Sequence, residues 1–156
     1  MTANKIRVAK DKADLVKALT ASSETTGPFQ TYADAIAFAA VLGRNRQKRI
    51  PLTEISKKEP GSIGIEIFIS RGYDPVLKLL AIAETKDIKI LSSNDEIFER
   101  ERHQIFEEYA NGGLEILRDE LRGAVDYSER LLLILSLGRG DQEELEGEFD
   151  LSRFLG

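Results

Sequence analysis

The sequence predicts a mostly α-helical fold, a compact bundle of about six helices with one short N-terminal β-strand. Two observations lead to this prediction. Apolar residues recur at spacings of three and four along most of the 156 residues, and residues that favour helix ends stand at the borders of these stretches. A chain of this length fits one domain. We expect a helical domain over residues 1–138 and an acidic, mobile tail over residues 139–156.

The first elements are a strand and a helix. Ile6 and Val8 alternate with two basic residues, which is the pattern of a short half-buried strand. Asp11 can then cap a helix that runs to about Leu19. Residues 20–30 are rich in serine, threonine, glycine and proline, so they form a loop.

The next helix is predicted from Thr31 to Leu42. Thr31 is a good N-cap, Asp34 favours the first turn, and Gly43 is a C-terminal stop signal. Between these signals the sequence is apolar nearly all round and contains five alanines, which allow close helix packing. We therefore expect this helix at the centre of the fold or in the subunit interface of a homo-oligomer.

Four further segments complete the predicted helices. Residues 63–70 fit either a strand or a helix, and Asp74 with Pro75 begins a helix to about residue 84. Asn94 caps the next helix, in which Asn111-Gly112-Gly113 marks a kink, a break or a very close helix contact. A final helix spans residues 126–137. The helix after Asp74 is expected to bury Val76, Leu77, Leu79, Leu80 and Ile82.

The composition argues against an enzyme. Without cysteine there is no disulfide, thiolate zinc site, iron–sulfur centre or cysteine nucleophile, and one histidine, His103, cannot form a two-histidine metal motif. We therefore predict no catalytic residue, no cofactor and no metal. The apolar runs are too short to cross a bilayer and the N-terminus lacks a secretory signal, so we expect a cytoplasmic protein with no membrane partner.

Charge is divided along the chain. Residues 1–93 hold 15 lysines and arginines against 10 acidic residues, a net charge of +5, whereas residues 94–156 hold 7 against 17, a net charge of −10. This asymmetry is compatible with a polyanionic partner such as double-stranded DNA, or with two differently solvated faces. The acidic tail also carries apolar residues that an inert tail does not need, which predicts a partner-docking segment. These residues are Phe149, Leu151, Phe154 and Leu155.

Basic residues in two places are candidates for contacts with nucleic acid. Four cations follow the apolar helix within six residues, and two more alternate along the first strand. The candidates are Lys5, Arg7, Arg44, Arg46, Lys48 and Arg49. The alternative for the cations after the helix is a solvated loop. The order strand, helix, loop, helix also resembles ribbon-helix-helix proteins, although the long loop and the apolar second helix fit that architecture poorly.

Acidic residues and glycines offer weaker candidates. Glu99, His103, Glu107 and Glu108 lie within three turns of one helix, where a charged solvent face is expected in preference to a metal site. The glycines match neither nucleotide-binding loop pattern. A nuclease or phosphatase would need clustered carboxylates for magnesium, and the sequence scatters its carboxylates over several helices.

Four segments together resemble a known family. They are Phe29-Gln-Thr-Tyr-Ala-Asp34 with Phe38-Ala-Ala-Val-Leu-Gly43, Arg71-Gly-Tyr-Asp74, Ala83-Glu-Thr-Lys-Asp87, and Ile105-Phe-Glu-Glu-Tyr-Ala-Asn-Gly-Gly-Leu114. In these segments the chain resembles the small proteins associated with bacterial and archaeal DNA phosphorothioation (dnd-type) gene clusters. The resemblance extends over about residues 5–137 and leaves the acidic tail outside it.

The resemblance implies a role in a defence system that marks host DNA with sulfur and attacks DNA without the mark. It implies no enzymatic step, and it favours a helix for residues 63–70. Two functions follow from it. One is a non-catalytic accessory subunit that binds the DNA backbone or regulates the complex. The other is an adaptor that oligomerises and docks a larger modification or restriction subunit through its C-terminal tail.

Overall fold

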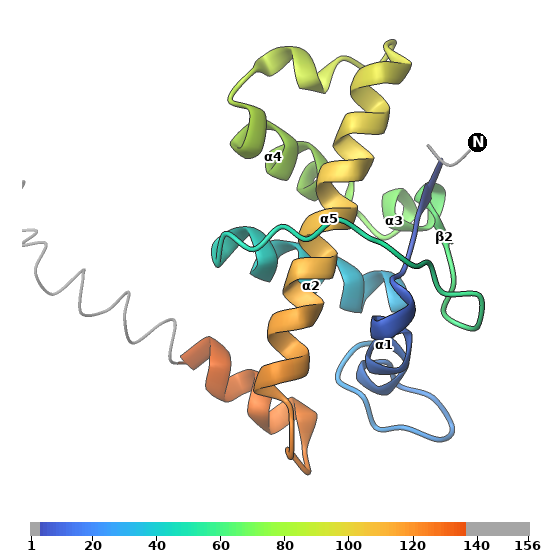
Figure 1. Cartoon of the computed structure of the whole chain (residues 1–156), viewed down its shortest axis with the longest axis vertical. Helices are drawn as coiled ribbons and strands as arrows, with labels where there is room; N and C mark the ends of the chain where they lie inside the picture. The colour runs from blue at the N-terminus through green and yellow to red at the C-terminus, as the bar shows by residue number, and fades with distance from the viewer. Residues whose placement is uncertain (1–3, 137–156) are drawn as a thin grey trace, which may run out of the picture. The chain divides into compact units, whose positions relative to one another are not determined.

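The computed structural model describes residues 4–136 and confirms the mostly helical fold. In chain order the elements are β1 (Lys5–Ile6), the 3₁₀ helix η2 (Lys10–Lys12), α1 (Ala13–Leu19), α2 (Tyr32–Asn45), β2 (Ile63–Gly64), α3 (Ile65–Ser70), α4 (Asp74–Thr85), the 3₁₀ helix η3 (Ile88–Leu91) and α5 (Glu96–Glu120) (Figure 1). Residues 127–136 form a further helix.

The chain divides into two compact units, residues 1–120 and residues 121–156. The predicted border between the helical domain and the tail, after residue 138, lies outside the described residues and stays a prediction. Within the described part of the chain, no helix is both long and apolar enough to cross a membrane.

The crossing of α2 and α5 is the centre of the first unit (Figure 1). A Cβ atom at Gly113 would fall on the carbonyl oxygen of Ala39, and one at Gly43 would fall on that of Tyr109. Only a hydrogen atom fits at these two positions, so the glycines set how closely the backbones approach. The close contact considered for Asn111-Gly112-Gly113 is therefore present, without a break: α5 is one helix of 25 residues.

The borders of α2 follow the predicted signals at one end only. Thr31 and Asp34 form a capping box: Asp34 N donates to Thr31 Oγ1 at 3.2 Å, and Thr31 N donates to Asp34 Oδ2 at 3.2 Å. Gly43 was expected to end the helix, which is wrong because α2 continues to Asn45 and buries Gly43 at the crossing. The left-handed backbone occurs later, at Gln47 with φ of 53°.

The predicted central position of α2 is confirmed within the chain itself. Eight of its residues are buried, including Ala37 and Ala39. Val41, which is 48% exposed, lies on the side of the helix that faces water. Because α5 covers this helix, the fold does not require a subunit interface to bury it. The homo-oligomer stays a prediction.

The N-terminal strand pairs within its own chain. β1 and β2 are antiparallel, with Lys5 opposite Gly64 and Ile6 opposite Ile63. The ribbon-helix-helix alternative needs a ribbon formed between two copies, so this pairing argues against it. Residues 63–70 contain both predicted alternatives, since they begin as β2 and continue as α3.

Two expectations near α4 and α5 are wrong in detail. Leu79 was expected in the core but is 65% exposed, because the buried residues of α4 are Leu77, Leu80 and Ala81 on the opposite side of the helix. The cap of α5 is Asp95 rather than Asn94, since Asp95 Oδ1 accepts a hydrogen bond from Ile97 N at 2.9 Å. The final helix begins as predicted, with Asp126 Oδ1 accepting from Glu129 N at 3.2 Å.

Asp34 also fastens the start of α2 to the turn between α3 and α4. Its Oδ1 accepts from Arg71 Nε at 2.7 Å and from Tyr73 OH at 2.6 Å, and its Oδ2 accepts from Arg71 Nη2 at 2.7 Å. Burial alone would raise the pKa of Asp34, but the hydrogen bonds from Arg71, Tyr73 and Thr31 outweigh it and lower the pKa. The folded state therefore favours the charged carboxylate.

Replacing Asp34 with asparagine is expected to cost about 2–4 kcal/mol of unfolding free energy at neutral pH, since the amide loses the charge and one of the two acceptor oxygens and turns an N–H donor towards the donors that this oxygen bound. A lowered pKa contributes stability above the ordinary value of 3.8, and this stability is lost as the pH falls through the folded-state pKa. The difference in unfolding free energy between wild type and Asp34→Asn should thus become smaller below pH 3.8. Urea unfolding at neutral and acid pH measures both effects.

The matched control is Asp74→Asn, which removes a pair with Lys78 whose side chains are both 41% exposed. Exposed pairs contribute about 0–1 kcal/mol, so this variant should unfold almost as wild type does at every pH. A pH-independent difference for Asp34→Asn would show that the charge of Asp34 is not what stabilises the turn.

Candidate nucleic-acid and partner interfaces

Arg7, one of the predicted nucleic-acid contacts, is bound within the protein. Its Nε donates to Glu107 Oε2 at 3.0 Å, its Nη2 donates to Glu107 Oε1 at 2.7 Å, and its backbone N also donates to Oε2 at 2.8 Å. The Glu107 side chain is only 5% exposed. Breaking such a pair would leave a buried carboxylate without a partner, so Arg7 is poorly available for phosphate.

Arg44 and Arg49 both lie over the ring of Tyr109, each with Cζ 5.9 Å from its centroid. Arg49 Nε donates to Glu108 Oε1 at 2.8 Å, and its Nη1 lies 3.7 Å from Glu84 Oε1. Tyr109 OH donates to Glu84 Oε2. Arg44 Nη2 donates to the carbonyl oxygen of Ala83 at 3.4 Å, so both guanidinium groups beside this ring have partners within the protein.

The other three predicted cations are less restrained. Lys5 in β1 and Arg46 after α2 are exposed, and Lys48 is half-buried. The carbonyl oxygen of Lys48 occupies the space that a side chain at Gly112 would need. The structure therefore divides the six predicted residues into three that are bonded within the protein and three that are less restrained, and both kinds occur in each of the two segments, residues 5–7 and 44–49.

The carboxylates that restrain these arginines were expected to face solvent, and that expectation is wrong. His103, Glu107 and Glu108 are all buried on α5. Lys12 is a further buried charge that the pattern did not indicate: its side chain is 2% exposed, and its Nζ donates to Asn111 Oδ1 at 3.1 Å. Within residues 4–136, no group of three or more possible ligands could hold a metal ion.

The final helix presents an apolar surface. Leu131 and Ile134 are buried, whereas Leu132, Leu133 and Leu135 are 66%, 54% and 51% exposed. The predicted docking residues Phe149, Leu151, Phe154 and Leu155 lie outside the described residues.

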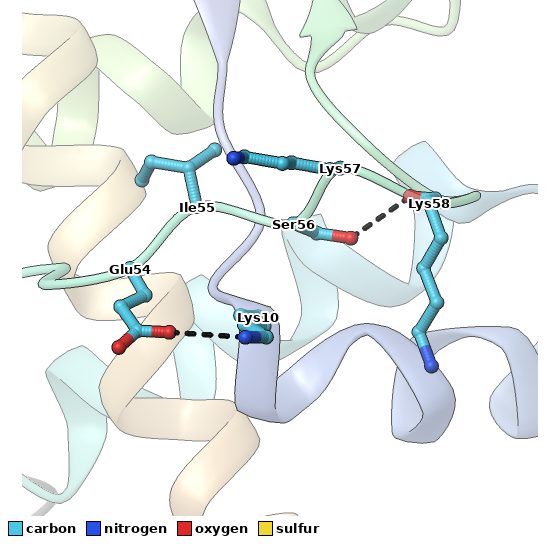
Figure 2. Close-up of a pocket in the computed structure, with 6 residues that line it drawn as sticks. All are labelled: Lys10, Glu54, Ile55, Ser56, Lys57 and Lys58. Atoms are coloured by element: carbon cyan, nitrogen blue, oxygen red, sulfur yellow. Dashed lines mark hydrogen bonds and ion pairs between the residues drawn. The ribbon is translucent and has the colours of Figure 1, made fainter.

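A hollow that sequence reasoning missed lies beside the N-terminal segment. Its volume is about 670 Å³, and its lining residues are Lys10, Glu54, Ile55, Ser56, Lys57 and Lys58 (Figure 2). Segments distant in sequence form it, because Lys10 N donates to Glu54 O at 2.9 Å and Ser56 N donates to Val8 O at 2.8 Å. The adjacent lysines 57 and 58 were the available signal, but only the backbone pairing brings Lys10 to them.

The four segments that carry the family resemblance contact one another. Asp34 joins the first segment to the turn at Arg71 and Tyr73, and Tyr109 joins the last segment to Glu84. The glycine crossing connects residues 38–43 with residues 105–114. These segments thus form the framework of the fold. They define a small, mostly helical protein whose central helices are joined by buried ionic groups.

Comparison with protein-family models identifies the group to which this framework belongs. The model described as DNA sulphur modification system-associated protein 4 matches residues 5–154, and the chain belongs to this family. The protein is thus associated, by family, with a DNA sulphur modification system. The resemblance was expected to end near residue 137. The match instead includes most of the acidic tail. Neither a curated protein nor a solved structure matches the chain.

Proposed function

We propose that the protein is a non-catalytic accessory subunit of a DNA sulphur modification system and acts as an adaptor. In this proposal its C-terminal segment, residues 127–155, docks a larger protein of the modification or restriction machinery. The observation that carries the proposal is the row of exposed leucines 132, 133 and 135 on the final helix. Apolar side chains gathered on a surface favour association with a protein partner.

The sequence beyond this helix supports the same surface. Phe149, Leu151, Phe154 and Leu155 place apolar anchors among acidic residues, a composition typical of segments that bind a partner. The family match continues to residue 154, so it extends over Phe149, Leu151 and Phe154 and ends just before Leu155. Leucine side chains would supply the buried area of the interface, and the acidic residues would select a partner with a basic rim.

The internal bonding of the predicted arginines is the reason to prefer an adaptor. A phosphate would have to displace Glu107 from Arg7, or Glu108 from Arg49, and both carboxylates are buried on α5. The cost of leaving a buried carboxylate unpaired is about 3–5 kcal/mol, which exceeds the benefit of one exposed phosphate contact. The patch predicted from the sequence therefore gives little support to DNA binding as the main function.

The double variant Leu132→Asp/Leu135→Asp should lose its partner. We expect at least a tenfold drop in co-purification from the native host, because two charges would enter the apolar centre of the interface. Affinity purification with mass spectrometry measures the loss, and nuclease treatment of the lysate removes partners bridged by DNA. Deletion of residues 140–156 should also abolish co-purification and leave folding intact.

The matched control is Leu79→Asp, which changes an equally exposed leucine on α4. It should retain the partner. Thermal unfolding of each variant separates loss of the interface from loss of the fold. Co-purification that survives both the double variant and the deletion would overturn the adaptor proposal.

A further inference from the structure

The lysines around the hollow are held much more weakly than the arginines of the predicted patch. Lys10 lies 3.3 Å from Glu54, and these side chains are 70% and 73% exposed. Lys58 lies 2.8 Å from Asp14, and these are 61% and 84% exposed. Ion pairs this exposed contribute little to stability, so an incoming anion can replace the carboxylates at little cost. Among the described residues, no carboxylate pairs with Lys57.

The backbone beneath these lysines is ordered although it contains no regular element. Residues 46–62 connect the end of α2 to β2 and contain no helix or strand. Their one β-bridge is an isolated pair between Ala9 and Ile55. Backbone and side-chain bonds fix the segment: Ile50 N donates to Glu108 O at 3.1 Å, and Ser56 Oγ donates to Lys58 O at 2.8 Å. Loops of this length inside a compact unit usually serve a function.

The direction of the lysine side chains limits the kind of ligand. In Figure 2, Lys57 extends towards Ile55, Lys10 lies on the other side of the backbone, and Lys58 extends away from both. The three ammonium groups therefore do not converge on one point, as they would around a single phosphate. They suit an extended anion that offers several charges along its length.

We infer that the hollow lined by Lys10, Glu54 and residues 55–58 is a contact site for the sugar–phosphate backbone of a nucleic acid. Lys10, Lys57 and Lys58 would each approach one phosphate as a point charge, and Ile55 would face the sugars. The hollow contains no arginine fork or amide side chain that could read base edges, so binding would depend on salt and be indifferent to sequence. This site is independent of the proposed adaptor surface.

Titration of the full-length protein with a short DNA duplex tests the inference by fluorescence anisotropy. With three phosphate contacts, the slope of log affinity against log salt should be about −2.7, which is roughly a 40-fold loss of affinity between about 50 and about 200 mM salt. The variant Lys10→Ala/Lys57→Ala/Lys58→Ala should lose most of this affinity and most of the slope. A parallel measurement of the melting temperature at increasing concentrations of inorganic phosphate tests whether the free ion binds.

The charge-matched control is Lys86→Asn/Lys89→Ala/Arg100→Ala, which removes three exposed cations elsewhere in the first unit. Asparagine is used at position 86 because Lys86 has a left-handed backbone with φ of 55°. The control should bind the duplex as wild type does. An equal loss of duplex affinity in both variants would indicate that the duplex responds to general surface charge, and it would overturn the proposed site. The proposed site would also be overturned if the wild-type protein did not bind the duplex at low salt, or if inorganic phosphate alone raised its melting temperature. The lysine variant should still co-purify with the protein partner, which keeps this test separate from that of the adaptor.

Discussion

A glutamate in place of Ala39 is expected to unfold the protein. Ala39 is completely buried, and its carbonyl oxygen occupies the position that a Cβ atom at Gly113 would need. A glutamate side chain at this position would start inside the closely packed α2–α5 crossing, away from water. Burying an unpaired charge there should cost more than about 4 kcal/mol, against a typical total stability of about 5–15 kcal/mol. Circular dichroism with thermal or urea unfolding measures the loss.

Val41→Glu is the matched control, since it introduces the same side chain two residues further along the same helix. Val41 is 48% exposed, so the new carboxylate can reach water. We expect a change within about 0.5 kcal/mol. An Ala39→Glu variant that kept its melting temperature would show that the two helices are not in close contact. A folded variant that changed only its oligomeric state would place this side of α2 in a subunit interface.

Local signals in the sequence predicted most of the elements, although Asp11 does not cap the first helix: it lies within η2, and α1 begins at Ala13. Helix starts depend on one side chain bonding to a nearby backbone N–H, which is why Thr31 and Asp126 could be identified by residue type and position alone. Glycines are more ambiguous. Gly43 looked like a helix stop and Gly112-Gly113 like a possible break, yet both sites lie inside helices at the crossing. In a single sequence, a glycine that ends a helix cannot be distinguished from one that lets a neighbouring backbone approach closely.

The candidate site was predicted less well, because its chemistry depends on distant partners. Arg7 and Glu107 are 100 residues apart, and Arg49 and Glu108 are 59 apart. Helical periodicity assigns a charged residue to the solvent face unless a partner is known, so the buried carboxylates of α5 could not be recognised. The arginines that these carboxylates bind then looked like free cations. Of the six predicted contacts, Arg7, Arg44 and Arg49 have internal partners.

Phe106→Ala is expected to lower the free energy of unfolding by about 3–5 kcal/mol, a loss comparable to that expected for Ala39→Glu. Phe106 is 0% exposed at the middle of α5, and its ring meets that of Phe68 edge to face, with centroids 5.3 Å apart and planes at 78°. Truncation would remove this aromatic contact and leave a cavity between α3 and α5. Chemical unfolding should show a lower midpoint with an unchanged denaturant slope, as for a two-state fold with a weaker core.

Leu79→Ala is the control for this variant, and it also tests the correction made for α4. The sequence pattern placed Leu79 in the core, and a buried leucine would cost about 2–5 kcal/mol on truncation. The structure exposes 65% of Leu79, so its loss should change the unfolding free energy by no more than about 0.5 kcal/mol. If Leu79→Ala proved as damaging as Phe106→Ala, the buried side of α4 would be the one predicted from the sequence. If Phe106→Ala proved mild, the α3–α5 contact would not be part of the core.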